Sequence, residues 1–568
     1  MKTWPAWAMV LVGVALSLPV LRGGLHDDDF FHRLALSGRA PAFRRDLWSL
    51  YEFVPSSGEA RRLIDHGLLP WFADPELRTR FFRPLSSALI GLDVKGFGDR
   101  ALPAYLHSLI WFSVVLWLVV RIHRRLLSER AAFWASLSYA IAGAHAATTS
   151  WIAARHVLVG TAFGLAAFAV SLSWRDKRGR LALGGGLASG ALLTVGFLAS
   201  EAALSAVPLL LSELWLGRRE ARRERLQQAL PVVVVTLVYL GLYALAGYGT
   251  RRMGSYVSPF ETPGRFAVAA LERLPLLLEE AFLGAPCALG QLGGVLRWTL
   301  WGLGVVSAVL VVRWFRRAAA ADTTRRLSWI PLGLLGALVP FLGPILDGRV
   351  LAMPLLASSM LVGVVIAGRG VGARVPRWGS AALLIAACGL SPLSRVLMTW
   401  VSAQVSETEL AMVSRAKIDC PSGGRVYVVN AADPAIGLYS GPLFHLAGSG
   451  WRSWHVLTVA PNDLELEARG ERSLVLRTLG PRATSEFEWV QRASALAAGT
   501  KVRAQGLSAE VLRSSSEGET EVLFELEEEL DSGCLLRWNG GADGFFESLT
   551  LPANGTLKLP HEPGPLGI

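Results

Sequence analysis

Residues 103–121 read PAYLHSLIWFSVVLWLVVR, an apolar run long enough to cross a lipid bilayer as a single helix. Runs of this kind recur as far as about residue 398, and we interpret about eleven of them as transmembrane helices. The predicted spans are 4–22, 103–121, 131–149, 156–174, 181–199, 201–217, 229–248, 292–312, 329–347, 350–368 and 379–398. The chain is therefore predicted to begin with an all-α polytopic membrane domain.

The overall composition excludes several other classes of protein. Of the 568 residues, 52% are hydrophobic and only 18% are charged, whereas soluble proteins carry about 25% charged residues. The chain is too apolar to be disordered, and its 4 cysteines are too few for a disulfide scaffold. The formal net charge of +11 comes from basic residues clustered between apolar runs. This distribution indicates cytoplasmic loops of a membrane protein and argues against nucleic acid as a partner.

The basic clusters also predict the orientation of the chain. They alternate along the sequence with loops that are nearly free of Lys and Arg. The clusters occupy 121–130, 175–180, 218–225, 313–326 and 369–377. Because basic loops stay cytoplasmic, the N-terminus is predicted to be cytoplasmic and the long segment 23–80 to lie outside. We expect an integral, multi-pass protein of a bacterial inner (plasma) membrane.

After residue 400 the composition changes, and Gly, Ser, Glu and Arg become frequent. Short strand-like stretches separated by turn residues occupy 425–430, 455–459, 474–479 and 521–526. We therefore expect a membrane domain at 1–400, with a long first outer loop at 23–80, followed by a β-rich extracytoplasmic domain at 401–568.

Two cysteines of the C-terminal region could pair with each other. Cys420 and Cys534 would lie in an oxidising compartment if the predicted topology holds. We hypothesise a disulfide between them, and two unpaired buried thiols are the alternative.

An acidic triplet follows the first predicted span, in the sequence His26-Asp27-Asp28-Asp29-Phe30-Phe31-His32. Three adjacent carboxylates repel one another, so a counter-charge, a metal or raised pKa values are implied if they are enclosed. A solvated acidic loop is the plainer alternative. The triplet could hold a divalent metal through its oxygens, but the sequence establishes no cofactor.

Basic and aromatic residues gather on the same predicted outer face. Residues 81–98 form an expected interfacial amphipathic helix, with Arg83 near its start. The outer turn between two predicted spans carries His145, Trp151, Arg155 and His156. Arg and His together at such a turn suit an anionic group such as phosphate.

Glu201 is a carboxylate between two apolar runs, in the sequence LASEAAL. A carboxylate in that position needs a cationic partner. We expect an arginine of the same face, Arg155, to be the partner that Glu201 orients.

In this ordered set of residues the chain resembles the GT-C membrane glycosyltransferases, which use polyprenyl-phosphate sugar donors. It is most similar to the protein O-mannosyltransferase-like branch, including the tetratricopeptide-containing O-mannosyltransferases. The branch has an acidic pair in its first outer loop, a Tyr/Phe-Arg-Pro-Leu segment, a His-Thr-Glu…Trp-Ile-x-x-Arg stretch and a Lys-Glu pair. The matching residues here are Asp27–Asp29, Phe82–Leu85, His145 with Trp151, Ile152 and Arg155, and Ser200-Glu201. Two positions depart from the pattern, because Ala147 replaces the family Glu and Ser200 replaces the family Lys.

The resemblance implies a GT-C-like membrane fold and transfer of a hexosyl or mannosyl group, with inversion, from a lipid-phosphate donor to an extracytoplasmic protein or glycan. It implies that Asp28 is the catalytic base and that Asp29 assists it. Arg83, Arg155 and His156 would bind the donor phosphate. Asp27, His145, Trp151 and Glu201 would support them.

Two functions from other classes remain open at this point. A polytopic transporter would carry charges near the midplane of the membrane and inverted repeats, whereas the charges here fall at the outer ends of the spans. A membrane-anchored binding or sensor protein would use residues 401–568 as its binding module, and so many spans exceed what an anchor needs.

Overall fold

The computed structural model describes residues 4–320, 326–368, 375–482, 488–540, 543–552 and 555–564. These residues form two compact units. The helical unit comprises Met1–Gly23, Phe82–Tyr248 and Val257–Ala403, and the β-rich unit comprises Gly24–Phe81, Gly249–Tyr256 and Gln404–Ile568. The long outer loop thus groups with the C-terminal region, while the predicted division into domains at residue 400 stays a prediction.

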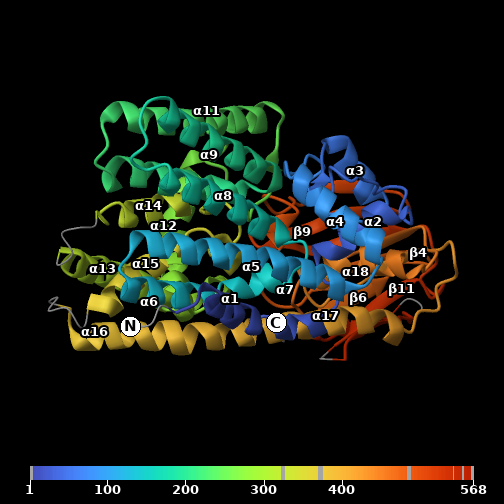
Figure 1. Ribbon diagram of the computed structural model, residues 1–568. Coiled ribbons are helices and arrows are strands. Elements are labelled where there is room, and N and C mark those ends of the chain that lie inside the picture. The colour runs from blue at the N-terminus through green and yellow to red at the C-terminus, as the bar shows by residue number, and fades with distance from the viewer. Residues whose placement is uncertain are drawn as a thin grey trace. The chain divides into compact units, whose positions relative to one another are not determined.

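The helical unit is built from α-helices that are joined by short turns and 3₁₀ segments. Its helices are α1 (Ala6–Ala15), α4 (Pro84–Phe97), α5 (Ala101–Leu126), α6 (Glu129–Ala140), α7 (His145–Ser150), α8 (Arg155–Ser173), α9 (Arg180–Ala199), α10 (Ala206–Ser212), α11 (Arg222–Leu245), α12 (Pro263–Phe282), α13 (Gly294–Ala320), α14 (Ile330–Leu338), α15 (Leu355–Gly368) and α16 (Arg377–Ile385). A further helix, α17 (Ser391–Arg415), contributes residues to both units. Within the helical unit, α8, α9 and α11 lie side by side (Figure 1).

Six helices of the described chain are long and apolar enough to cross a membrane. They are Ala101–Leu126, Arg155–Ser173, Arg180–Ala199, Arg222–Leu245, Gly294–Ala319 and the continuous stretch Arg377–Arg415. Each coincides with a predicted span. A multi-pass membrane protein is therefore confirmed, while the predicted number of spans stays a prediction.

The other predicted spans correspond to shorter or broken helices. Three of them contain the apolar helices Ala6–Ala15, Ile330–Phe341 and Leu355–Gly368. The remaining two, 131–149 and 201–217, are each divided between several short helical segments. Hydropathy alone does not detect such breaks, because the residues at the break remain apolar.

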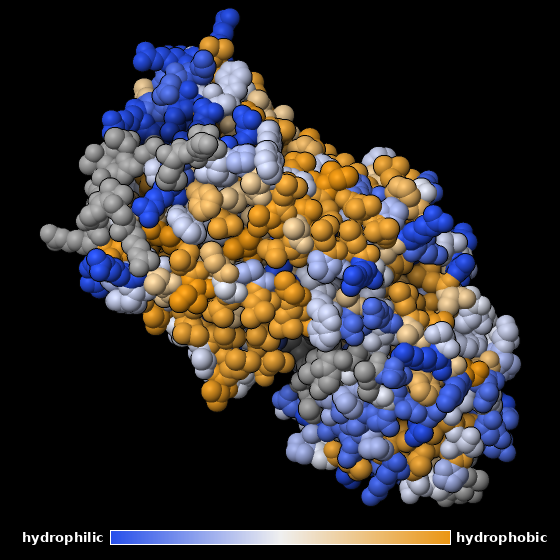
Figure 2. Space-filling view, turned by 60° about the horizontal axis from the view of Figure 1, so that its bottom comes forward, coloured by the Kyte–Doolittle hydropathy of each residue, from blue (hydrophilic) through white to orange (hydrophobic). Residues whose placement is uncertain are grey.

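Apolar side chains cover much of the molecular surface that Figure 2 shows. Large hydrophobic residues are exposed on the helices that are candidate spans. Examples are Leu237 (62% exposed) and Leu245 (89%) on α11 and Leu393 (65%) and Trp400 (58%) on α17. Exposure of this extent is expected where lipid replaces water as the solvent.

Two helices of this unit, α4 and α12, are not among the candidate spans. The segment expected to form an interfacial helix forms α4, with Pro84 in its first turn, where a missing N–H costs no hydrogen bond. Its position at the membrane interface stays a prediction. The sequence did not predict α12, because Glu272, Arg273, Glu279 and Glu280 interrupt its apolar pattern.

The β-rich unit contains three sheets and the helices α2 (Asp28–Ser37), α3 (Ser57–Asp65) and α18 (Pro434–Ala447). A three-stranded sheet has the order β1-β2-β3, a six-stranded sheet the order β13-β6-β7-β10-β9-β8, and a four-stranded sheet the order β12-β11-β4-β5. The strands are β1 (Glu52–Val54), β2 (Arg78–Arg80), β3 (Gly249–Arg251), β4 (Arg425–Val428), β5 (Ser453–Val456), β6 (Leu464–Ala468), β7 (Ser473–Thr478), β8 (Lys501–Ala504), β9 (Leu507–Ser515), β10 (Gly518–Leu526), β11 (Leu535–Asn539), β12 (Phe545–Ser548) and β13 (Thr556–Leu559). The predicted strands correspond to β4, β5, β7 and β10, and the β-rich C-terminal region is confirmed.

A β-α-β unit and a disulfide constrain the C-terminal region of this unit. The strands β4 and β5 pair in parallel and are connected by α18, which makes a β-α-β unit. Cys420 and Cys534 form a disulfide, as predicted from their compartment.

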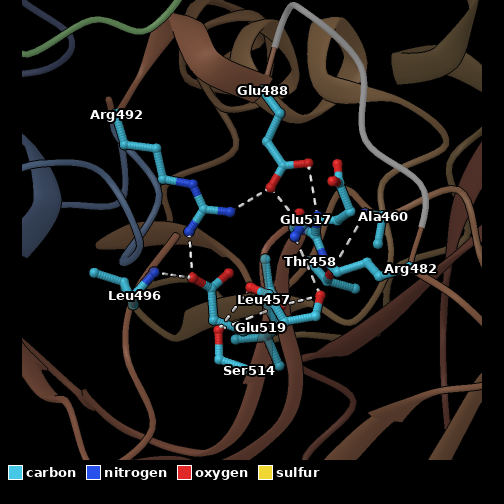
Figure 3. Close-up of polar contacts among 12 residues, drawn as sticks. Leu457, Thr458, Ala460, Arg482, Glu488, Arg492, Leu496, Ser514, Glu517 and Glu519 are labelled. Carbon is cyan, nitrogen blue, oxygen red and sulfur yellow. Dashed lines mark hydrogen bonds and ion pairs between the residues drawn. The ribbon is translucent and has the colours of Figure 1, made fainter. Parts of the chain in front are cut away.

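A buried cluster of ions holds the three chain segments of the β-rich unit together (Figure 3). Glu488 accepts hydrogen bonds from both Arg482 and Arg492, and Arg492 also binds Glu519. The guanidinium of Arg492 lies 5.0 Å from the ring centroid of Phe72. Its carbonyl accepts a hydrogen bond from Gly254 at 3.0 Å. Loss of one member would leave a buried charge without its partner, so the members of this cluster depend on one another.

Three arginines of the predicted basic loops, Arg325, Arg369 and Arg374, lie outside the described residues.

Candidate functional site

The acidic triplet lies at the start of α2, in the β-rich unit. Asp28 is the first helical residue, and Asp27 before it has a φ of 53°. A non-glycine residue in that conformation stores about 1–3 kcal/mol of strain. The loop is therefore held by contacts that outweigh this cost.

The imidazole of His26 supplies the counter-charge that the triplet requires. The imidazole Nδ1 lies 2.9 Å from Oδ2 of Asp27. The backbone N–H of His26 donates a hydrogen bond of 3.4 Å to Oδ2 of Asp29. Burial alone would lower the pKa of His26, but the hydrogen bond to Asp27 and the charges of Asp27, Asp29 and Glu409 raise it to about 10. His26 is therefore cationic at neutral pH and neutralises part of the acidic loop.

The three carboxylates of the triplet have different environments. Asp29 is only 1% exposed, whereas Asp27 and Asp28 are half-buried. Oδ1 of Asp28 accepts a hydrogen bond of 3.0 Å from the hydroxyl of Tyr439 on α18. Asp27 and Asp28 thus both combine access to solvent with a fixed carboxylate, which is what a general base needs. Asp28 is the better suited of the two, because a neutral hydroxyl holds it, whereas the cationic His26 holds Asp27.

Sequence reasoning missed two members of this site. Glu409 on α17 is buried, and its carboxylate helps to raise the pKa of His26. Tyr439 on α18 binds Asp28 from a position 411 residues away in sequence. Neither residue belongs to a local motif, so only the fold reveals them.

The described residues contain no group of three or more His, Cys, Asp or Glu side chains arranged to hold a metal ion.

A second polar cluster lies in the helical unit around Arg83, which precedes α4. Its Nε donates to Oε2 of Glu201 at 2.7 Å, and Tyr243 donates to the other oxygen of Glu201 at 3.0 Å. The Arg83 side chain remains 13% exposed. Glu201 therefore orients an arginine that solvent can still reach.

His156 also contacts this arginine, and the contact defines its tautomer. Nη1 of Arg83 lies 3.1 Å from Nε2 of His156, and Nδ1 of His156 lies 2.8 Å from Oγ of Ser200. Because an arginine can only donate, Nε2 accepts and Nδ1 carries the proton. Ser200, which replaces the family Lys, therefore anchors His156. Its hydroxyl also accepts from the N–H of Ala202 at 3.1 Å and so caps the following helical turn.

Arg155 forms a separate network and is itself only 1% exposed. It binds Asp93, its Nε donates to Oγ of Ser108 at 2.9 Å, and its Nη2 donates to the carbonyl of Ala104 at 2.6 Å. The expectation that Glu201 orients Arg155 is wrong, because Glu201 pairs with Arg83 instead. The role of Arg155 as a phosphate ligand stays a prediction, and its buried network favours a structural role.

His145 and Trp151 belong to the packing around these clusters. His145 is buried and in contact with the rings of Phe112 and Tyr139. The ring of Trp151 lies under the guanidinium of Arg349, 4.6 Å from its carbon. Both residues therefore pack among the helices of this unit.

Comparison with known families supports the resemblance in one segment. Residues 83–246 match the family described as dolichyl-phosphate-mannose-protein mannosyltransferase. The matched segment covers less than half of the chain and contains Arg83, Arg155, His156 and Glu201. The predicted mannosyltransferase-like character is confirmed for this segment, but the closer likeness to tetratricopeptide-containing members is not shown.

Solved structures show only distant likenesses. The apo oligosaccharyltransferase of Archaeoglobus fulgidus is 14% identical with a TM-score of 0.44, over 80% of this chain and 65% of that one. The oligosaccharyltransferase AglB of the same organism, bound to an inhibitory peptide and a dolichol-phosphate, is 13% identical with a TM-score of 0.41, over 79% and 64%. The arabinofuranosyltransferase AftD from Mycobacteria is 11% identical with a TM-score of 0.38, over 81% and 32%. The chain thus spans less than two thirds of the length of each structure. A comparison with curated proteins finds no match.

Proposed function

We propose that this chain is a membrane glycosyltransferase that transfers a sugar from a polyprenyl-phosphate-linked donor to an extracytoplasmic acceptor. One observation carries the proposal. The cluster of Arg83, His156 and Glu201 lies within the segment that matches a family named for a lipid-phosphate sugar donor. A mannosyl donor is the first candidate, because the family is named for it.

Inverting transfer requires two kinds of assistance, which the two clusters offer separately. The acceptor hydroxyl attacks the anomeric carbon, its proton passes to the Asp28 carboxylate, and the bond from the anomeric carbon to the donor phosphate oxygen breaks. The electron pair of that bond leaves with the polyprenyl phosphate. The transferred proton needs a base, and the leaving phosphate needs positive charge.

Arg83 is the residue best suited to the leaving phosphate. A guanidinium presents its donors in a planar fork that matches phosphate oxygens. Glu201 and His156 hold that fork in place through Nε and Nη1, at 2.7 Å and 3.1 Å. We propose that His156 acts on the phosphate through Arg83, because Arg83 and Ser200 occupy both of its ring nitrogens.

The proposed location and partners follow from the predicted topology and from the proposed reaction. The acidic loop and the β-rich C-terminal region would face the extracytoplasmic side of a bacterial inner membrane, with the N-terminus in the cytoplasm. The disulfide between Cys420 and Cys534 supports an oxidising compartment for this region. The donor would enter from the membrane lipid, and the acceptor would be a protein or a glycan.

Purified protein in liposomes with radiolabelled polyprenyl-phosphate mannose tests the proposal. We expect label transfer to an added acceptor, or slow release of free sugar by transfer to water. Release needs no knowledge of the acceptor, so it separates a wrong acceptor from a wrong function. Parallel reactions with other polyprenyl-phosphate hexoses and pentoses would identify the sugar. Counterflow of a solute without any donor turnover would favour a transporter and overturn the proposal.

A further inference from the structure

The hydrogen bond between Tyr439 and Asp28 joins two segments of the β-rich unit that are far apart in sequence. Asp28 begins α2, directly after the acidic loop, and Tyr439 lies near the middle of α18. Figure 1 shows these two helices near each other, and their residues are in contact. The C-terminal region therefore reaches the carboxylate that the proposed function uses as its base.

We infer that the C-terminal region positions this base, with Tyr439 as the positioning residue that fixes the Asp28 carboxylate. The inference rests on the proposed function. On this inference, residues 401–568 contribute to the reaction centre and do not form an independent binding module. A carboxylate at a half-buried helix start can rotate about two side-chain bonds. A donor at 3.0 Å from Oδ1 restricts that rotation.

Tyr439 is itself held firmly enough to restrict another side chain. Its ring packs edge-on against Phe31 of α2, with 5.9 Å between the ring centroids. Asp433 caps the start of its helix, and Oδ1 of Asp433 accepts hydrogen bonds from the N–H groups of Ala435 and Ile436 at 2.8 and 2.9 Å. The strands β4 and β5, which precede and follow α18, pair in parallel in the four-stranded sheet, so both ends of α18 are connected to that sheet.

The chemistry of Tyr439 makes it a donor and not a second base. Burial and the neighbouring carboxylates of Asp28 and Asp27 raise the pKa of Tyr439 well above its ordinary value. The hydroxyl therefore keeps its proton at neutral pH. A proton donor next to a carboxylate favours the ionised form of that carboxylate, which is the form that can accept a proton.

Further contacts within the same unit would hold the segment that contains α2 against the region that contains α18. The cluster of Arg482, Glu488 and Arg492 ties the segment 24–81 to the C-terminal strands (Figure 3). The hydrogen bond from Asp74 N–H to the carbonyl of Gln491, at 2.9 Å, makes a second link between them. The acidic loop is thus anchored to the region that supplies Tyr439.

Tyr439→Phe is the direct test, because it keeps the ring against Phe31 and removes only the hydroxyl. In the full-length protein in liposomes, we expect turnover to fall on the order of 10-fold, as expected when a hydrogen bond to a charged group is lost. The acid limb of the pH–rate profile should move to higher pH, because an Asp28 that has lost its donor is protonated more easily. Donor affinity should stay unchanged.

Two further variants separate positioning from a structural effect. Tyr427→Phe removes a hydroxyl from the same unit, one that donates to the carbonyl of Gly506 at 2.7 Å, and should leave the pH profile unchanged. The double variant Asp28→Asn/Tyr439→Phe should be no slower than Asp28→Asn alone, since Tyr439 acts only through Asp28.

Each outcome decides between the two proposals. Wild-type turnover with an unchanged rate and pH profile in Tyr439→Phe would overturn the inference and leave the proposed function standing. Additive losses in the double variant would do the same. A wild-type protein that turns over no lipid-phosphate sugar would overturn the proposed function and the inference together.

Discussion

Nε of Arg83 donates to Oε2 of Glu201 across 2.7 Å, although the two residues are 118 positions apart in sequence. The pair brings together the start of α4 and the turn that follows α9. Its side chains are 13% and 22% exposed, so the pair is neither sealed in the core nor fully solvated. Such a pair can hold an arginine in place while the guanidinium remains accessible to an anion.

Arg83→Lys should weaken donor binding on the order of 10-fold, because a point charge replaces a fork that makes paired hydrogen bonds. Glu201→Gln should show the same defect in milder form, since Arg83 would keep its charge but lose its orientation. Titration of the reconstituted protein with a fluorescent polyprenyl-phosphate sugar measures both. Arg297→Lys is the matched control, because Arg297 pairs with Glu272 at 2.5 Å on other helices of the same unit. Equal losses in all three variants would argue for a general structural effect.

Arg155→Lys should instead lower stability. Arg155 is saturated by Asp93, Ser108 and Ala104, and a lysine cannot reach all three partners at once. We expect a loss on the order of 1–3 kcal/mol, seen as a lower thermal midpoint in detergent. Donor affinity of the folded fraction should change little. A large loss of donor affinity without loss of stability would instead support Arg155 as a phosphate ligand.

His26→Gln should destabilise the protein in a pH-dependent way. The folded-state pKa of His26 is raised from 6.5 to about 10 by Asp27, Asp29 and Glu409, against the effect of burial. A raised pKa means that the charged imidazole stabilises the folded state fully below pH 6.5, and that this contribution disappears as the pH rises toward 10. The difference in thermal midpoint between wild type and His26→Gln should therefore be largest near pH 6 and shrink toward pH 10. A difference in thermal midpoint that stays the same from pH 6 to pH 10 would contradict this prediction.

The sequence predicts some parts of this molecule because their determinants are local. The apolar runs at α5, α8 and α9 define helices by themselves, and the short apolar stretches at β7 and β10 define strands in the same way. α12 escapes detection because four charged residues interrupt its apolar pattern, although the fold buries three of them.

The candidate site is only partly predictable for a related reason. The ordered motifs locate Asp28, Arg83 and Glu201, but side-chain pairing depends on directions that only the folded helices determine. Glu201 could have met Arg83 or Arg155 on the same evidence, and it meets Arg83. Tyr439 belongs to no motif, because its partner lies 411 positions away.

Single-cysteine labelling should establish the orientation. In a background without Cys287 and Cys388, an impermeant maleimide should label Ala447→Cys in intact cells. It should label Ala221→Cys, in the basic loop before α11, only after permeabilisation. Both alanines are exposed, so access to the reagent is matched. The reverse pattern would place the β-rich unit in the cytoplasm and remove the extracytoplasmic acceptor from the proposal.

Asp28→Asn should reduce transfer by about 10²–10⁴-fold, because an amide cannot accept the proton of the acceptor hydroxyl. Donor binding should remain, since asparagine keeps the size of the side chain. The hydroxyl of Tyr439 can still donate to its amide oxygen, so the variant should fold. Single-turnover transfer from labelled donor, with donor affinity measured in parallel, separates the chemical step from binding.

The neighbouring carboxylates serve as internal controls for Asp28. Asp27→Asn should lose the ion pair with His26 and some stability, but little of the chemical rate, because Asp27 faces His26 at 2.9 Å. Asp29→Asn should show an intermediate defect, since the buried Asp29 contacts the backbone of the loop and not solvent. A large loss in Asp27→Asn or Asp29→Asn, with near-normal transfer by Asp28→Asn, would move the base to another carboxylate. Full transfer by the triple variant would remove general-base catalysis by this loop, because no carboxylate of the triplet would then remain to take the proton.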